Sequence, residues 1–105
     1  MNVAQIYNAS DWFQVLQTTE RSQTAVMTLE PGAASEEKLS SHPGSDQVLF
    51  VVEGEVCADV SGETATIKAG DVVIVPAGAK HKFTNPSKTR AVTFSVYAPP
   101  AYPED

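Results

Sequence analysis

Glycine, proline, asparagine and serine interrupt the chain at short, regular intervals, and this spacing limits the possible folds most strongly. Between the breaks lie runs rich in β-branched and aromatic residues, at residues 12–20, 24–30, 47–54, 55–60, 63–70, 71–78, 80–85 and 91–98. Strands that recur about every 8 to 12 residues between turn signals are typical of a β-sandwich or barrel. The predicted fold class is therefore all-β, with one weak helix candidate over residues 7–15, which Asn8 or Ser10 could cap.

The length and composition predict a single domain with its own core. The 105 residues include 42% hydrophobic residues, enough for a core that needs no disulfide or metal to fold. We expect an N-terminal arm over residues 1–11, a barrel over 12–98 and a Pro-rich tail over 99–105. Proline removes donors from a strand ladder, so the tail must leave the sheet. It could be a strap over the barrel or over a neighbouring subunit, or a frayed end.

The net charge and the cysteine content limit which classes of binding partner and which cellular compartment we expect. The net charge is −6, and the basic residues are scattered apart from a small group at Lys80, Lys82, Lys88 and Arg90. This balance argues against nucleic acid or an anionic membrane as a partner. The chain opens without a signal-peptide pattern and has no apolar run of membrane-spanning length. The lone Cys57 fits a reducing compartment, so the predicted location is cytoplasmic.

Residues 70–85, "GDVVIVPAGAKHKFTN", carry glycine, proline and histidine at spacings with physical meaning. The apolar run near the start of this segment can be buried on both faces, and Pro76 then ends the strand ladder. Gly78 allows the chain to reverse. Strand alternation in the next run places His81 and Phe83 together on the inward face. Taken alone, an inward histidine is usually a core residue bonded to a backbone carbonyl.

This spacing resembles the second motif of the cupin family, G-x5-P-x-G-x2-H-x3-N. Its defined positions are matched by Gly70, Pro76, Gly78, His81 and Asn85. The upstream residues 31–54 resemble the first cupin motif, G-x5-H-x-H-x3,4-E-x6-G. Counting back from the closing glycine, Gly54, puts Gln47 at the glutamate position, His42 at the second histidine and Ser40 at the first.

The resemblance covers nearly the whole barrel and implies a fold, an assembly and a metal site. The implied fold is the cupin double-stranded β-helix, a jelly-roll barrel, which commonly forms a homodimer. In metal-binding cupins three histidines and one glutamate hold a divalent ion such as Fe, Mn, Ni, Cu or Zn. Here His42 and His81 keep their identity, while Gln47 and Ser40 replace family ligands. A carboxamide oxygen is a weaker, uncharged donor, so the affinity for metal is expected to be reduced.

Three hypotheses for this site remain open from the sequence. His42, Gln47 and His81 could hold a metal with water in the open positions, and Glu36 or Glu37 could supply a further ligand. The same groups could instead act without metal on a small molecule, by acid/base or hydrogen-bonding chemistry. They could also form a polar network that only orders the barrel.

The expected function is a barrel-mouth site for a divalent metal and a small organic ligand, such as an organic acid, a sugar or a phenolic. An enzyme of this kind would be a metal-dependent oxygenase, isomerase or lyase. The alternative is a metal-free binding or sensing cupin without turnover. We expect Ser40, Phe50 and Phe83 to contact the ligand, although aromatic residues in barrel strands are commonly core packing. Trp12 and Phe13 could belong to the core or to a dimer surface.

Overall fold

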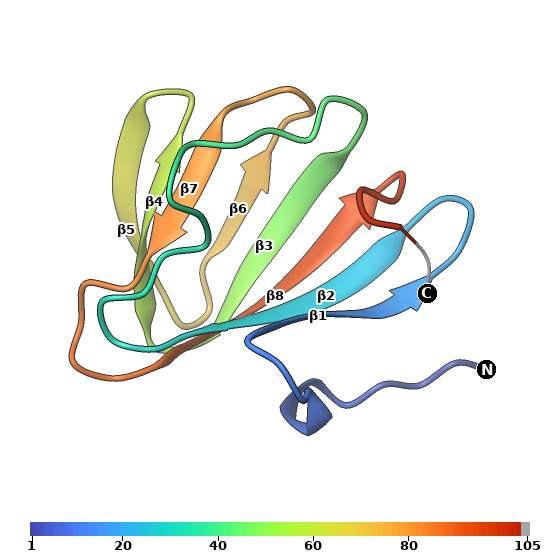
Figure 1. Ribbon diagram of the computed structural model, residues 1–105, viewed down its shortest axis with the longest axis horizontal. Helices are drawn as coiled ribbons and strands as arrows, with labels where there is room; N and C mark the ends of the chain where they lie inside the picture. Colours follow the sequence, from blue (N-terminus) through green and yellow to red (C-terminus); the bar gives the residue numbers. More distant parts are fainter. Residues whose placement is uncertain (104–105) are drawn as a thin grey trace.

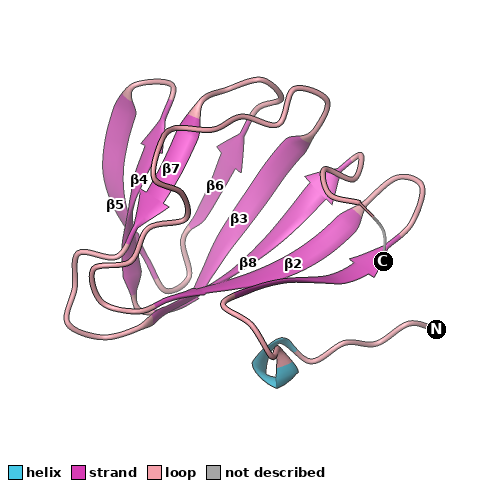
Figure 2. Ribbon diagram, in the orientation of Figure 1, coloured by secondary structure: helices cyan, strands magenta, loops and turns pink. Residues whose placement is uncertain are grey.

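Eight strands form two antiparallel sheets that face each other in the computed structural model, which describes residues 1–103 (Figures 1 and 2). The strands are β1 (Phe13–Thr18), β2 (Gln23–Leu29), β3 (Asp46–Glu53), β4 (Glu55–Val60), β5 (Glu63–Lys68), β6 (Val72–Val75), β7 (His81–Thr84) and β8 (Ala91–Ala98). One sheet has the order β1-β2-β8-β3-β6 and the other β5-β4-β7. One strand falls on each predicted run, although β2 and β3 begin one residue ahead of theirs, and the all-β jelly-roll expectation is confirmed.

The N-terminal arm lies outside the two sheets (Figure 1). Its short 3₁₀ helix, η1, covers Ile6–Asn8, and β1 begins at Phe13. The helix expected over residues 7–15 is therefore reduced to one turn near its start, because the alternating residues that follow pair with β2. No helix within residues 1–103 is long and apolar enough to cross a membrane.

The core lies between the two sheets. Strand alternation sends every second residue inward, as in β3, where Leu49 and Val51 are fully buried. The buried cluster consists of Met27, Leu29, Leu49, Val51, Val56, Ala58, Val75, Phe83 and Ala91. Phe83 joins this cluster from the second sheet, as its inward position predicts. Cys57 points away from the core, on the opposite side of β4 from Val56 and Ala58.

The expectation that the apolar run of β6 is buried on both faces is wrong. Val72 and Ile74 are 58% and 61% exposed, whereas Val75 is 2% exposed. The reason is that β6 is an edge strand of the five-stranded sheet, and only its inner face meets the second sheet. Its outer face continues the outer face of β3, because Ile74 pairs with Val48.

Two positions of the cupin motifs have clear structural roles. Gly54 has a φ of +80°, and a Cβ there would lie 2.5 Å from the Arg90 carbonyl oxygen, so glycine is required. Asn85 is buried, and its Nδ2 donates to the carbonyl oxygens of Leu29 and Thr89, both at 2.8 Å. These residues fix the loops at the end of the barrel that lies away from the histidines.

Residues 99–103, which we call the C-terminal strap, are held against the barrel by side chains. Gln23 is only 1% exposed, and its Oε1 accepts hydrogen bonds from the amides of Ala101 (3.1 Å) and Tyr102 (3.0 Å). Its Nε2 donates to the Tyr102 carbonyl at 3.0 Å. Ser45 Oγ donates to the Pro100 carbonyl at 3.2 Å. Of the two possibilities for the tail, the described part is a strap over its own barrel, while residues 104–105 lie outside the described residues.

Candidate ligand-binding site

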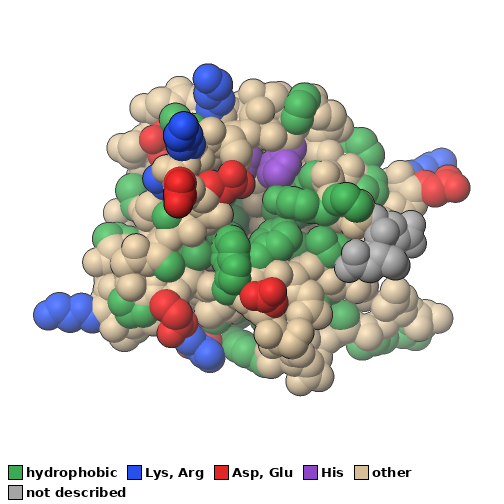
Figure 3. All heavy atoms as spheres, in the orientation of Figure 1, with side chains coloured by type: hydrophobic (Ala, Val, Ile, Leu, Met, Phe, Trp, Pro, Cys, Tyr) green, Lys and Arg blue, Asp and Glu red, His purple; other side chains and the backbone are tan. Residues whose placement is uncertain are grey.

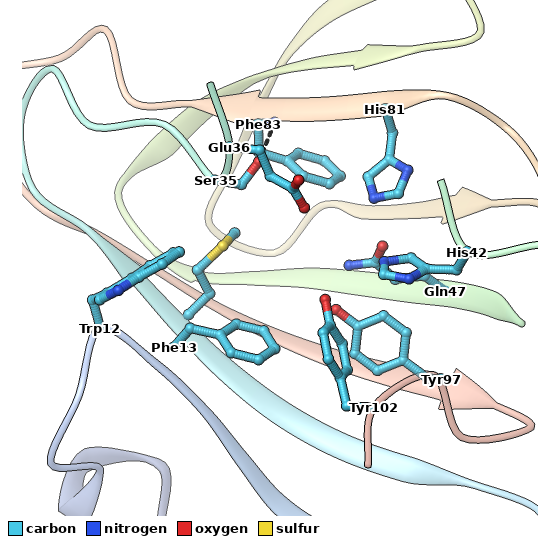
Figure 4. Close-up of a pocket in the computed structure, with 11 residues that line it drawn as sticks. Trp12, Phe13, Ser35, Glu36, His42, Gln47, His81, Phe83, Tyr97 and Tyr102 are labelled. Carbon is cyan, nitrogen blue, oxygen red and sulfur yellow. Dashed lines mark hydrogen bonds between the residues drawn. The ribbon is translucent and has the colours of Figure 1, made fainter. Parts of the chain in front are cut away.

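A cavity of about 290 Å³ opens at one end of the barrel. Its largely apolar walls come from Trp12, Phe13, Met27, Phe83, Tyr97 and Tyr102, and its polar groups from Ser35, Glu36, His42, Gln47 and His81. Figure 4 shows these side chains converging from both sheets, the loop ahead of β3 and the C-terminal strap. In the space-filling view, the histidine atoms lie beside hydrophobic and acidic side chains in this hollow (Figure 3). The volume is near the lower end of the roughly 300–1,000 Å³ typical of small-molecule sites.

His81 is the most rigidly placed polar group of the cavity. It is buried at the start of β7, where its backbone exchanges two hydrogen bonds with Ser40. Its Nδ1 lies 3.1 Å from the Ala79 carbonyl oxygen. A carbonyl can only accept, so Nδ1 donates in this contact, and Nε2 is the ring nitrogen left for another partner. The carbonyl contact expected of a core histidine is thus present, but the ring also faces the cavity.

His42 comes from the loop ahead of β3 and lies against His81, with 5.0 Å between the ring centroids. Tyr97 and Tyr102 pack edge-on against His42, with centroids at 5.2 and 5.4 Å. Burial, and secondarily the proximity of His81, lowers the pKa of His42, while the charge of Glu36 opposes this shift. The lowered pKa makes the His42 imidazole neutral at neutral pH.

Gln47 supplies an unsatisfied acceptor to the site. The residue is 3% exposed, and its Nε2 donates to Ser95 Oγ at 3.1 Å. Its Oε1 is buried and has no hydrogen-bond partner among the described residues. An unpaired buried acceptor costs about 1–3 kcal/mol, so this oxygen is a place for a water or ligand donor.

Of the three residues predicted to contact a ligand, one lines the cavity and two do not. Phe83 lines the cavity, as predicted. Phe50 does not, because it stands three residues from Gln47 and therefore on the other face of β3, where it is 38% exposed. The placement of Phe50 in the pocket is wrong, and strand parity could have shown this. Ser40 lies next to His81 through its backbone, but its side chain is not part of the cavity lining.

The outer cavity wall is built from both ends of the chain, which the motif comparison alone did not predict. Phe13 of β1 packs against Tyr102 of the strap, with ring centroids 5.0 Å apart. Trp12 lies beside Phe13 at 6.0 Å, and Tyr97 lies 5.2 Å from Tyr102. Alternation along β8 signals that Tyr97 points inward, whereas no local pattern places Tyr102.

The residues present do not reproduce the metal-binding set of the family. The donors that face one another are two imidazoles and one carboxamide oxygen, and none of them carries a negative charge to offset a dication. Within residues 1–103, no three His, Cys, Asp or Glu side chains come together as possible ligands. Glu36 does line the cavity, as one alternative anticipated, and Glu37 does not. We therefore assign no chemical step to a metal here.

Comparison with known proteins now defines the family. A family model described as "Cupin domain" matches residues 25–97. The chain belongs to the cupin family, as the two motifs and the two facing sheets indicate. Among solved structures, TT1209 from Thermus thermophilus superimposes with a TM-score of 0.81 at 30% identity, over 94% of this chain and 98% of that one.

Two curated relatives match shorter stretches. The uncharacterized protein SCO3923 of Streptomyces coelicolor is 44% identical over 55 residues, covering 52% of this chain and 51% of the relative. The auxin-binding protein ABP19b of Prunus persica is 33% identical over 66 residues, covering 58% of this chain and 32% of the relative. The chain thus spans about half or less of the length of these relatives.

Proposed function

We propose that this cupin binds a small organic molecule in the barrel mouth, through neutral hydrogen-bonding groups at the inner end and aromatic walls at the outer end. The observation that carries the proposal is the unpartnered Oε1 of Gln47, which is buried beside two imidazoles in an otherwise largely apolar cavity. A polar network that only ordered the barrel would satisfy this oxygen internally.

The histidine pair fits a hydrogen-bonding role in this proposal. His42 is neutral at neutral pH because burial lowers its pKa, and the contact of His81 Nδ1 with the Ala79 carbonyl leaves His81 Nε2 for a ligand. Neutral imidazoles can accept or pass a proton without the cost of a second buried charge. The proposal covers binding, and it includes no tightly bound metal, because Gln47 and Ser40 replace two family ligands and no three His, Cys, Asp or Glu side chains within residues 1–103 come together.

The test compares thermal unfolding of three proteins across a panel of neutral, anionic and cationic small metabolites. A ligand that binds the folded state raises the melting temperature as its concentration exceeds its Kd. We expect such a shift in the wild type, loss of the shift in Gln47→Leu, and retention in Gln14→Leu, a control outside the cavity. If no compound raises the melting temperature of the wild type, the proposal is wrong.

A metal assay accompanies this panel. The wild type, purified without chelator or histidine tag, is expected to contain less than stoichiometric metal and to bind panel compounds equally well after treatment with EDTA. Stoichiometric metal that is lost in both His42→Ala and His81→Ala would contradict the metal-free form of the proposal and restore the sequence-based hypothesis. Homodimerisation and a cytoplasmic location stay predictions, and the exposed apolar residues of β3 and β6 are where we would place a dimer contact.

A further inference from the structure

The charge around the cavity has one sign. Glu36 contributes a carboxylate to the lining, and none of the lysines and arginines within residues 1–103 lies there. An anionic ligand would therefore find no lysine or arginine to pair with and would approach a carboxylate. This arrangement favours a cation.

The inner end of the cavity presents hydrogen-bond acceptors. Gln47 Nε2 donates a hydrogen bond to Ser95 Oγ, whereas Gln47 Oε1 has no partner among the described residues. His81 Nδ1 contacts the Ala79 carbonyl oxygen, so Nε2 is the ring nitrogen that is left for a ligand. Gln47 of β3 and His81 of β7 lie on the two facing sheets, and together they are complementary to a ligand group with more than one N–H or O–H donor.

The walls between these acceptors and the opening are aromatic. Phe13, Tyr97 and Tyr102 form a continuous set, with centroid separations of 5.0 and 5.2 Å, and Trp12 extends it toward the exterior. Figure 4 shows the tyrosine hydroxyls and the Glu36 carboxylate directed toward the same space. Aromatic faces attract organic cations through the ring quadrupole, most strongly where water is excluded.

We infer that the ligand of this site is a small protonated organic amine, whose ammonium group meets Gln47 and His81 and whose apolar part packs among Phe13, Tyr97 and Tyr102. This inference rests on the proposed function and names its ligand class. It replaces the organic acid suggested by the sequence, because an acid has no lysine or arginine to pair with in the cavity. The sugar and the phenolic are uncharged, and the neutral probe below tests against them.

Three isosteric probes test the charge preference by titration calorimetry at pH 7.5: benzylamine, benzyl alcohol and benzoate. Benzylamine is protonated at this pH and keeps the ring size of the other two. We expect it to bind roughly tenfold more tightly than benzyl alcohol, since a partly desolvated cation on aromatic rings gains about that factor. Benzoate is expected to bind most weakly.

A matched pair of variants tests the role of the carboxylate. Glu36→Gln is expected to weaken benzylamine binding several-fold while leaving benzyl alcohol unchanged, because only the charged probe loses an attraction. Glu37→Gln removes the same charge from the adjacent residue, which does not line the cavity, and should alter neither affinity. Equal effects of the two variants on benzylamine affinity would mean that only the overall negative charge of the protein matters, and would overturn the role given to Glu36.

The outcomes also separate this inference from the proposed function. Tighter binding of benzoate or benzyl alcohol than of benzylamine would overturn the amine assignment and leave the barrel-mouth site in place. The same holds if none of the three probes binds while another compound of the metabolite panel does, unless that compound is itself an amine. Absence of any ligand in both experiments would overturn the proposed function as well.

Discussion

The two faces of β3 differ in a way that reverses the usual sorting of polar and apolar residues. On the inner face the buried Gln47 stands at the barrel mouth, followed by Leu49 and Val51 in the core. On the outer face Val48 and Phe50 are 37% and 38% exposed, and the neighbouring strand adds the exposed Val72 and Ile74. One strand thus carries a buried carboxamide on one side and solvent-exposed apolar groups on the other.

This difference teaches where the molecule departs from the needs of folding alone. Buried polar groups cost stability unless they are bonded, and Gln47 keeps an unbonded oxygen at the mouth. Apolar side chains that stay partly exposed gain less from folding than buried ones, and a contiguous set of them commonly marks an interaction surface. On the inner face this exception is the basis of the proposed ligand site. On the outer face it is where we would place the predicted dimer contact.

The largest expected effect is a difference in stability between substitutions on the inner and the outer face of β3. Leu49→Ala removes fully buried methyl groups and is expected to lower the free energy of unfolding by about 2–5 kcal/mol. Phe50→Ala, next to it on the outer face, should cost less than Leu49→Ala, because Phe50 keeps 38% of its surface exposed whereas Leu49 is fully buried. Denaturant unfolding of both variants checks this. Similar losses for the two would mean that the outer face is packed and that the contrast is false.

An intermediate effect is expected at the strap. Gln23→Leu removes the three hydrogen bonds that hold Ala101 and Tyr102, and it should lower the free energy of unfolding by about 1–3 kcal/mol. It should also weaken benzylamine binding, because Tyr102 forms part of the cavity wall. As a control, Ser45→Ala removes only one hydrogen bond to the strap, and it should lower the free energy of unfolding and the affinity by less. Unchanged affinity in Gln23→Leu would remove the strap from the site.

The smallest expected effect concerns pH. Burial holds the pKa of folded His42 below its ordinary value of 6.5. Between these two values the unfolded state binds more protons, so stability rises with pH through this window and is lost as pH falls below about 6.5. Unfolding midpoints at pH 7.5 and 5.5 should therefore differ less in His42→Gln than in the wild type. An equal pH dependence in both proteins would contradict the assigned burial of His42.

Much of the fold was predictable because its signals are local. Alternation and turn residues located all eight strands, and the cupin motifs placed His42, Gln47 and His81 in one region. The exposure of β6 was not predictable, since an apolar run looks the same at a sheet edge and at its centre. Tyr102 was likewise out of reach, because its position depends on Gln23, which lies 79 residues away in the sequence.

The strap contact also makes the assembly of the cavity observable at single backbone groups. The amide hydrogens of Ala101 and Tyr102 are both donated to Gln23 Oε1, so they exchange with solvent only when the strap detaches. Their deuterium uptake therefore reports how often the Tyr102 wall is absent, separately from unfolding of the sheets. A ligand that binds between Phe13 and Tyr102 would slow the hydrogen exchange of these two amides. Their exchange rates would therefore report whether the cavity is occupied.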